Sequence, residues 1–250
     1  MTLMQQIRAT PVPRGGIRLW WLGQNGFIFK SPEGTVVSTD LYLTDSCAAL
    51  GESIGVDLAR AVPVFTCTHN HQDHTDPETI RGLRNKDAAL FLGPHPSCAV
   101  FAAEGVESGR IQPAWPQGVF EFRDLRLRGT FALPTDTSDL NHMGFLLQFG
   151  NGPKVYITGD TDYTELLEEA AVHNPDLVIT VINGGFNNLS HWEAARLVKT
   201  IRPKAAIPCH YDMFWTNGVD PKMFEASLRI QGAEARYWEL RHGEGNVFEK

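Results

Sequence analysis

The chain has 250 residues, of which 42% are hydrophobic and 20% are charged, and its formal net charge is −7. This length allows a sizeable core, and the composition is that of an ordinary globular protein. The acidic balance gives no electrostatic reason to expect nucleic acid or an acidic membrane as a partner. No run approaches the ~20 apolar residues of a membrane span, and residues 1–14 lack the apolar segment of a signal peptide.

The cysteines indicate a reducing compartment. Cys47, Cys67, Cys98 and Cys209 lie far apart and form no C-x-x-C pair. Reduced thiols in a cytoplasmic protein are therefore expected, with Cys67 and Cys209 as small core residues.

Strands dominate the first half of the chain, and strands alternate with helices in the second half. Apolar runs predict strands at 17–22, 26–30, 35–38, 62–68, 88–92, 118–122, 125–133, 145–149, 155–158, 177–182, 205–209, 236–240 and 246–249. Helices are predicted at 76–84 and 98–103, around Leu166–Ala171, from the capping box Ser190–Glu193 to Ile201, and from Asp220-Pro221 onward. No linker or repeat interrupts this order, so we predict one domain, 1–250.

The stretch from His69 to Asp76 reads His-Asn-His-Gln-Asp-His-Thr-Asp. It follows a predicted buried strand and precedes a helix start in which Asp76 is the N-cap and Pro77 the first helical residue. Imidazole and carboxylate groups are ligands that suit zinc, manganese and iron. His69 and His71, two apart on an extended segment, can bind one ion, and Asp73 and His74 can bind a second. The alternative is a histidine-rich surface loop without a ligand.

Other polar groups lie just past the carboxyl ends of predicted strands. Asp136, Asp139 and His142 follow the strand ending near 133, Asp160 follows the strand 155–158, and His210 follows the strand 205–209. Metal sites built from several loops at one sheet edge need this placement. The alternatives are an N-cap role for Asp160 and a core role for His210.

The pattern His69-x-His71-x-Asp73-His74 resembles the signature of the metallo-β-lactamase superfamily. The resemblance implies an α/β fold, the metallo-β-lactamase-like αββα four-layer sandwich, with its metals at one edge of the two sheets. It further implies that Asp160 bridges two metals, that His210 completes the second site and that Asp40 braces the metal loop. A turn or cap role is the alternative for Asp40.

The third motif departs from that family, which usually has a histidine where this chain has Asp136. By position we favour Asp136 as an oxygen ligand, with His142 as a ligand or proton donor and Asp139 as a further candidate. An aspartate there would supply a hard oxygen ligand, which favours manganese.

Within the superfamily, Asp40-Leu41-Tyr42-Leu43, Ile182-Asn183-Gly184 and His210-Tyr211-Asp212-Met213-Phe214 resemble the L-ascorbate-6-phosphate lactonase branch. The resemblance implies a small-molecule substrate such as a phosphorylated sugar lactone, and it runs from about Leu19 to about Phe224. The sequence shows no phosphate clamp of Arg or Lys at a helix N-terminus.

The ligands imply a hydrolytic mechanism with two divalent ions, Mn²⁺ or Zn²⁺. Such ions lower the pKa of a bound water to near 7, and the resulting hydroxide attacks an ester or lactone carbonyl. Asp73 accepts or orients the proton, and His142 can donate one. Asn183 or Tyr211 is predicted to stabilise the oxyanion, with ordinary loop hydrogen bonding as the alternative.

Two other functions compete with the lactonase hypothesis. A phosphodiesterase or nuclease of the same superfamily commonly carries an added domain or a basic arm, and this chain shows neither. A non-catalytic metal sensor is the other candidate. Against it stand four aromatic residues able to line a substrate pocket, for which a core position is the alternative: Tyr163, Phe186, Tyr211 and Trp215. Self-association into a homo-oligomer stays open.

Overall fold

The computed structural model describes residues 3–44, 62–83 and 86–250. Cys47 and Arg84, the latter a predicted helix end, lie outside the described residues. The chain divides into two compact units, Met1–Ala114 with Arg241–Lys250 (unit 1) and Trp115–Leu240 (unit 2). Each unit contains one mixed seven-stranded sheet, and each is described separately below.

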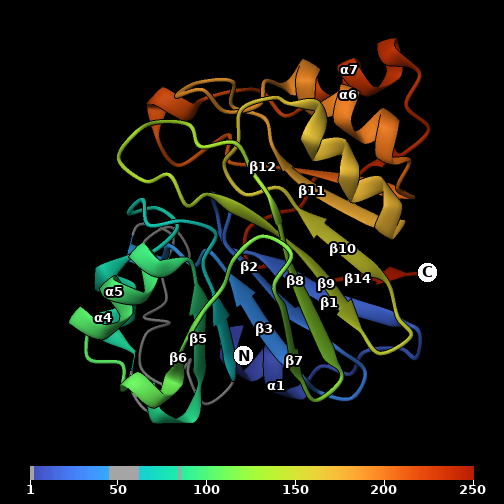
Figure 1. Ribbon diagram of the computed structural model, residues 1–250. Coiled ribbons are helices and arrows are strands. Elements are labelled where there is room, and N and C mark those ends of the chain that lie inside the picture. The colour runs from blue at the N-terminus through green and yellow to red at the C-terminus, as the bar shows by residue number, and fades with distance from the viewer. Residues whose placement is uncertain (1–2, 45–61, 84–85) are drawn as a thin grey trace. The chain divides into compact units, whose positions relative to one another are not determined.

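Unit 1 is built on a sheet with the strand order β14-β1-β2-β3-β4-β5-β6 (Figure 1). The pairs β14–β1, β1–β2 and β2–β3 are antiparallel, and the pairs from β3 to β6 are parallel. The strands are β1 (Gly16–Trp21), β2 (Phe27–Lys30), β3 (Val36–Thr39), β4 (Val64–Thr66), β5 (Leu90–Gly93), β6 (Ile111–Pro113) and β14 (Asn246–Glu249).

In its described residues, unit 1 has the short helical segments α1 (Leu3–Ala9), α4 (Pro77–Gly82), η2 (Lys86–Ala88), α5 (His95–Ala103) and η3 (Ser108–Arg110). At the start of α4, Asp76 accepts hydrogen bonds from the backbone N–H groups of Glu78 and Thr79, which confirms the predicted N-cap. One apolar cluster joins α1, α4 and α5 to the sheet, with Ile7, Ile80 and Phe101 among its buried members. This core anchors the segment between β4 and α4 at both of its ends.

Unit 2 has the strand order β13-β12-β11-β10-β9-β8-β7 (Figure 1). Its four strands from β10 to β13 are parallel, and β7 to β10 are antiparallel. The strands are β7 (Val119–Phe122), β8 (Leu125–Phe131), β9 (Met143–Phe149), β10 (Lys154–Ile157), β11 (Leu177–Val181), β12 (Ala205–Cys209) and β13 (Arg236–Tyr237).

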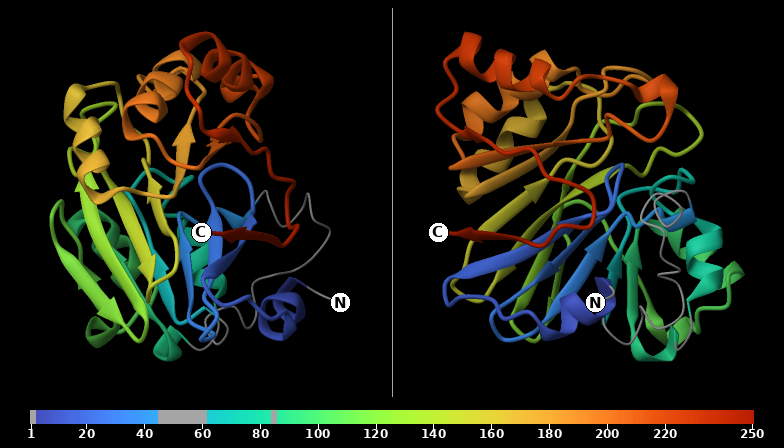
Figure 2. Two further views of the ribbon diagram at one scale, coloured as in Figure 1. Left: turned by 90° about the vertical axis from the view of Figure 1, so that its right-hand side faces the viewer. Right: turned by 180° about the vertical axis from the view of Figure 1, so that it is seen from behind.

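The helical segments of unit 2 are η4 (Glu165–His173), α6 (His191–Ile201), η5 (Trp215–Asn217) and α7 (Lys222–Gln231). Figure 2 shows α6 and α7 side by side, and α6 also contacts η4 and β11. The capping box is confirmed, because Ser190 accepts from the Glu193 backbone and the Glu193 side chain accepts from the Ser190 backbone. The predicted amphipathic helix after Tyr163 forms a 3₁₀ helix instead of an α-helix.

Parallel strands bring the polar segments to one edge of each sheet. In unit 1, Thr39 of β3 pairs with Thr66 of β4, so Asp40 leaves the sheet beside the segment that begins at Cys67. In unit 2, Val181 of β11 pairs with Cys209 of β12, so Asn183 and His210 leave beside each other. Among the described helices, none is long and apolar enough to cross a membrane.

Candidate metal centre

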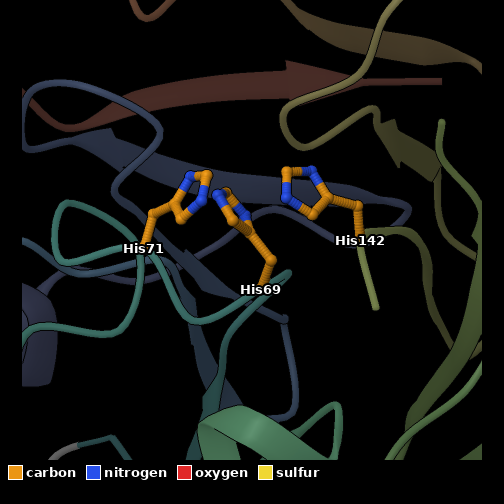
Figure 3. Close-up of side chains that lie close together, drawn as sticks. All are labelled: His69, His71 and His142. Carbon is orange, nitrogen blue, oxygen red and sulfur yellow. The ribbon is translucent and has the colours of Figure 1, made fainter. Parts of the chain in front are cut away.

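The segment after β4 gathers the four ligands predicted for unit 1, His69, His71, Asp73 and His74, here called the loop set. The His69 ring lies 4.4 Å from the His71 ring and 4.1 Å from the His74 ring, measured between centroids. His69 and His74 are fully buried, whereas His71 and Asp73 are partly exposed. Figure 3 shows His69 and His71 rising from this segment. The predicted convergence of these side chains is therefore present within unit 1.

Asp40 braces the loop set from the end of β3. Its Oδ1 accepts from the Thr68 N–H at 2.7 Å, and its Oδ2 accepts from Thr68 Oγ1 at 2.7 Å. His74 Nδ1 also lies 2.9 Å from Oδ2. Asp40 is fully buried and has a positive φ of 44°, a backbone conformation that is uncommon for non-glycine residues. The predicted bracing role of Asp40 is confirmed.

Asp40 also selects the tautomers of two histidines. A carboxylate only accepts, so His74 Nδ1 carries the proton and leaves a lone pair on Nε2. The Thr68 hydroxyl donates to Asp40, and therefore accepts at 3.1 Å from His69 Nδ1. His69 is then likewise protonated on Nδ1 with a lone pair on Nε2. Both rings hold the form that binds a metal ion.

The spacing of Asp73 and His74 suits two ligands of one ion. Asp73 Oδ2 lies 3.6 Å from His74 Nε2, which is too long for a hydrogen bond. Two ligands at roughly 2.0–2.2 Å from one tetrahedral ion lie about 3.3–3.6 Å apart. The donor types, the tautomers and this spacing all fit a divalent metal.

In unit 2, three donors from separate connections lie together: His142 before β9, Asp160 after β10 and His210 after β12, here called the strand-end set. His210 Nε2 lies 3.4 Å from Asp160 Oδ1, the same ligand-like spacing. Asp160 Oδ2 accepts from Asn188 Nδ2 at 2.7 Å, so Oδ1 is the oxygen turned toward the imidazole. Each of the three donors is buried.

His142, drawn in Figure 3, is oriented by the backbone next to Asp160. Its Nδ1 lies 3.1 Å from the Asp160 carbonyl oxygen, which can only accept. His142 therefore carries its proton on Nδ1 and has its lone pair on Nε2, as His69 and His74 do.

The predicted ligand Asp136 lies in a different setting. It is exposed, and its Oδ1 accepts from both the backbone N–H and the hydroxyl of Ser138, each at 2.7 Å. Asp139 is buried, and its Oδ1 accepts from the backbone N–H of Asn141 at 2.8 Å. Within unit 2, His142 contacts the backbone of Asp160. An aspartate that closes its own turn gives the same sequence signal as a ligand.

The two predicted oxyanion donors, Asn183 and Tyr211, lie in different environments. The Asn183 amide donates to the Gly185 carbonyl at 3.3 Å and to Asn217 Oδ1 at 3.4 Å, which is ordinary loop bonding. Tyr211 is buried, and burial, followed by the charge of Asp212, raises the pKa of its phenol far above the usual range. This shift favours the neutral form of the Tyr211 phenol.

The four candidate pocket aromatics divide into two groups. Tyr211 is buried and Tyr163 is partly exposed, whereas Phe186 is 67% exposed and Trp215 is 93% exposed. Gly185 and Thr216 approach closely, so Phe186 and Trp215 belong to adjacent connections of unit 2. Cys67 and Cys209 are buried as predicted, and burial raises the pKa of the Cys67 thiol well above its usual value.

The contacts of two asparagine amides with the candidate ligands were not predicted from the sequence. Asn188 donates to Asp160 and accepts from the Thr161 N–H at 2.9 Å, and the Asn217 amide lies 3.3 Å from His210 Nδ1. Both follow strand ends, where asparagine is also common in turns, so its presence alone carries little signal.

Comparison with known proteins decides the family. The sequence model of the beta-lactamase superfamily domain matches residues 18–210. The chain belongs to this superfamily. A metal-dependent hydrolase of Roseiflexus sp. (strain RS-1) is 28% identical over 233 residues, covering 90% of this chain and 94% of the relative. A metal-dependent hydrolase of Thermoplasma acidophilum is 29% identical over 217 residues, covering 84% and 90%.

The fold of this chain also matches those of solved structures. A metallo hydrolase from the archaeon Ignicoccus hospitalis matches with a TM-score of 0.75 and 20% identity, covering 94% of this chain and 99% of the other. Two mixed sheets flanked by helices are the metallo-β-lactamase fold, so the predicted fold class is confirmed. Membership in the lactonase branch stays a prediction.

Proposed function

We propose that this chain is a metal-dependent hydrolase that opens a small lactone or ester. The observation that carries the proposal is the loop set, in which one buried carboxylate, Asp40, holds His69 and His74 in the tautomer that binds metal. The relatives named as metal-dependent hydrolases, which this chain matches over most of its length, support it.

The proposed ligands are the members of the two sets: His69, His71, Asp73, His74, His142, Asp160 and His210. These seven side chains are enough for two divalent ions with positions left open for water and substrate. His142 replaces Asp136 in this proposal because of its contact with Asp160. The replacement also removes the argument for manganese, since imidazole nitrogen suits zinc and iron.

Divalent ions held there would supply a Lewis acid and lower the pKa of water toward about 7. Asp73, partly exposed and close to His74, is placed to accept a proton from the attacking water. Tyr211, kept neutral by burial, is the proposed donor to the carbonyl oxygen of the substrate. Asn183 has the weaker case, because its amide already bonds to Gly185 and Asn217.

The choice of lactones rests on the motif His210-Tyr211-Asp212-Met213-Phe214 and its resemblance to L-ascorbate-6-phosphate lactonases. The exposed Phe186 and Trp215 offer apolar surface on which a small organic ring could pack. Elemental analysis of the purified protein, together with a panel of lactones, esters and phosphodiesters, tests the proposal. About two ions per chain and preferred lactone or ester turnover are expected. Under half an equivalent of metal after supplementation, or preferred phosphodiester cleavage, would refute it.

A further inference from the structure

The turn between β1 and β2 reaches both carboxylates of the loop set with consecutive side chains. Gln24 Nε2 donates to Asp73 Oδ2 at 2.8 Å, and Asn25 Nδ2 donates to Asp40 Oδ2 at 2.6 Å. Both amides are fully buried. A hairpin turn normally directs such amides into water, so their burial against carboxylates requires a specific arrangement.

The backbone of this turn is shaped for a close approach. Gln24 has a positive φ of 48°, and the Trp21 indole N–H donates to the Gln24 carbonyl at 3.0 Å. A Cβ at Gly26 would lie 3.0 Å from the Gly23 carbonyl oxygen and 3.2 Å from that of Asp40, so glycine is needed where the turn meets β3. A left-handed glutamine costs on the order of 1 kcal/mol or more and persists where the surroundings enforce it.

Asp73 is more exposed than the two buried histidines of the loop set. Asp40 and Thr68 orient His74 and His69, and Gln24 bonds to the partly exposed Asp73. A glutamine amide is a neutral donor, so it can fix one lone pair of Oδ2 without neutralising the carboxylate. The carboxylate thus keeps the negative charge that favours binding of a cation.

We propose that Gln24 is a positioning residue that orients Asp73 for metal binding, so that the β1–β2 turn sets the affinity of the site for one ion. The inference rests on the proposed function, because it takes Asp73 as a ligand. An outer partner of this kind typically changes metal affinity 10–100-fold.

The test is zinc affinity of the purified full chain, measured by competition with a chromophoric chelator. Gln24→Met keeps the size of the side chain and removes the donor, and it is expected to bind one zinc ion 10–100-fold more weakly than the wild type. Gln148→Met is the matched control, because Gln148 donates to the Gly150 carbonyl in unit 2, and its zinc affinity should equal the wild type.

A double-mutant cycle separates positioning from a general loss of structure. If Gln24 acts through Asp73, then Gln24→Met should add nothing in the Asp73→Asn background. Unchanged zinc affinity in Gln24→Met, or additive losses in the double variant, would overturn the inference. Gln24→Ala serves as a second variant should the methionine misfold, with the melting temperature of the metal-free protein as the check.

Wild-type zinc binding and lactone turnover are measured separately. A wild type that binds zinc but turns over no lactone contradicts the proposed substrate and leaves the inference standing. If the Asp73→Asn variant binds zinc as tightly as the wild type, the inference itself is wrong.

Discussion

The loop set and the strand-end set present the same donor groups but hold them in different ways. The loop set takes its four donors from six consecutive residues, and the single carboxylate of Asp40 fixes two of them. In the strand-end set each donor has a separate partner: the Asp160 carbonyl for His142, Asn188 for Asp160 and Asn217 for His210. The two buried histidines of the contiguous set thus share one brace, whereas the dispersed set depends on the register of several strands.

Removing one donor from either set should abolish function. We expect His69→Ala and His210→Ala each to lose more than the roughly 100-fold that an outer partner contributes at most. Both residues lie on connections at strand ends, so far-ultraviolet circular dichroism should remain that of the wild type. Turnover and circular dichroism on the same preparations check this. If either variant keeps most of its activity, that histidine is not a ligand.

The third motif gives the next largest effect. His142→Ala should lose bound metal, because the imidazole fixed by the Asp160 carbonyl is a proposed ligand. Asp136→Asn should keep its metal, because the Asp136 carboxylate is exposed and its Oδ1 already accepts twice from Ser138. Elemental analysis after dialysis distinguishes the two. Metal kept by His142→Ala and lost by Asp136→Asn would restore the aspartate as the ligand and the case for manganese.

The contrast between the sets also explains what the sequence could predict. The loop set was evident because four donors and the Asp76-Pro77 helix start are adjacent in the chain. Asp160 and His210 were predicted because each follows a short apolar strand, and parallel pairing from β10 to β12 puts such ends at one edge.

Long-range contacts could not be predicted in this way. Helix α1 and strand β6 were missed, because their short segments are polar or partly exposed and carry no clear periodicity. Gln24 and Asn25 lie between two predicted strands, but contacts across 49 and 15 residues leave no mark on the local sequence. The proposal of His142 in place of Asp136 rests on a hydrogen bond to a backbone atom, which side-chain identity does not encode.

Substitution of a residue that orients the ligands should lower metal affinity less than loss of a ligand, and the loss should differ between the two sets. Asp40→Asn should weaken metal binding about 100-fold, the upper end for an outer partner, because the amide cannot accept on both atoms from Thr68, Asn25 and His74. Asn188→Ala removes one bond to Asp160 and should cost about 10-fold. Chelator competition measures both. If the two variants lose metal affinity equally, a residue that orients two ligands matters no more than a residue that orients one.

The smallest expected effect is on the pH dependence of stability, and it comes from Tyr163, which follows Asp160 in the same connection. The Tyr163 hydroxyl donates to Glu168 Oε1 at 2.7 Å, and the Arg196 guanidinium lies 4.7 Å from the centre of the ring. Burial, and then the bond to Glu168, raise the pKa of Tyr163 to about 12, while Arg196 opposes the shift. An unfolded tyrosine has a pKa of about 10.

Because the folded pKa is the higher one, this tyrosine contributes stability that is complete below pH ~10 and is lost as the pH rises toward about 12. Tyr163→Phe should therefore show a shallower fall in the free energy of unfolding across that interval than the wild type. Urea titrations at several alkaline pH values measure this fall, and the difference in phenolate absorbance between the two proteins locates the ionisation. Since Asn188, and not Tyr163, holds the Asp160 carboxylate, zinc affinity at neutral pH should stay unchanged in this variant. A loss of zinc affinity in Tyr163→Phe would mean that the donors of the strand-end set are not held independently.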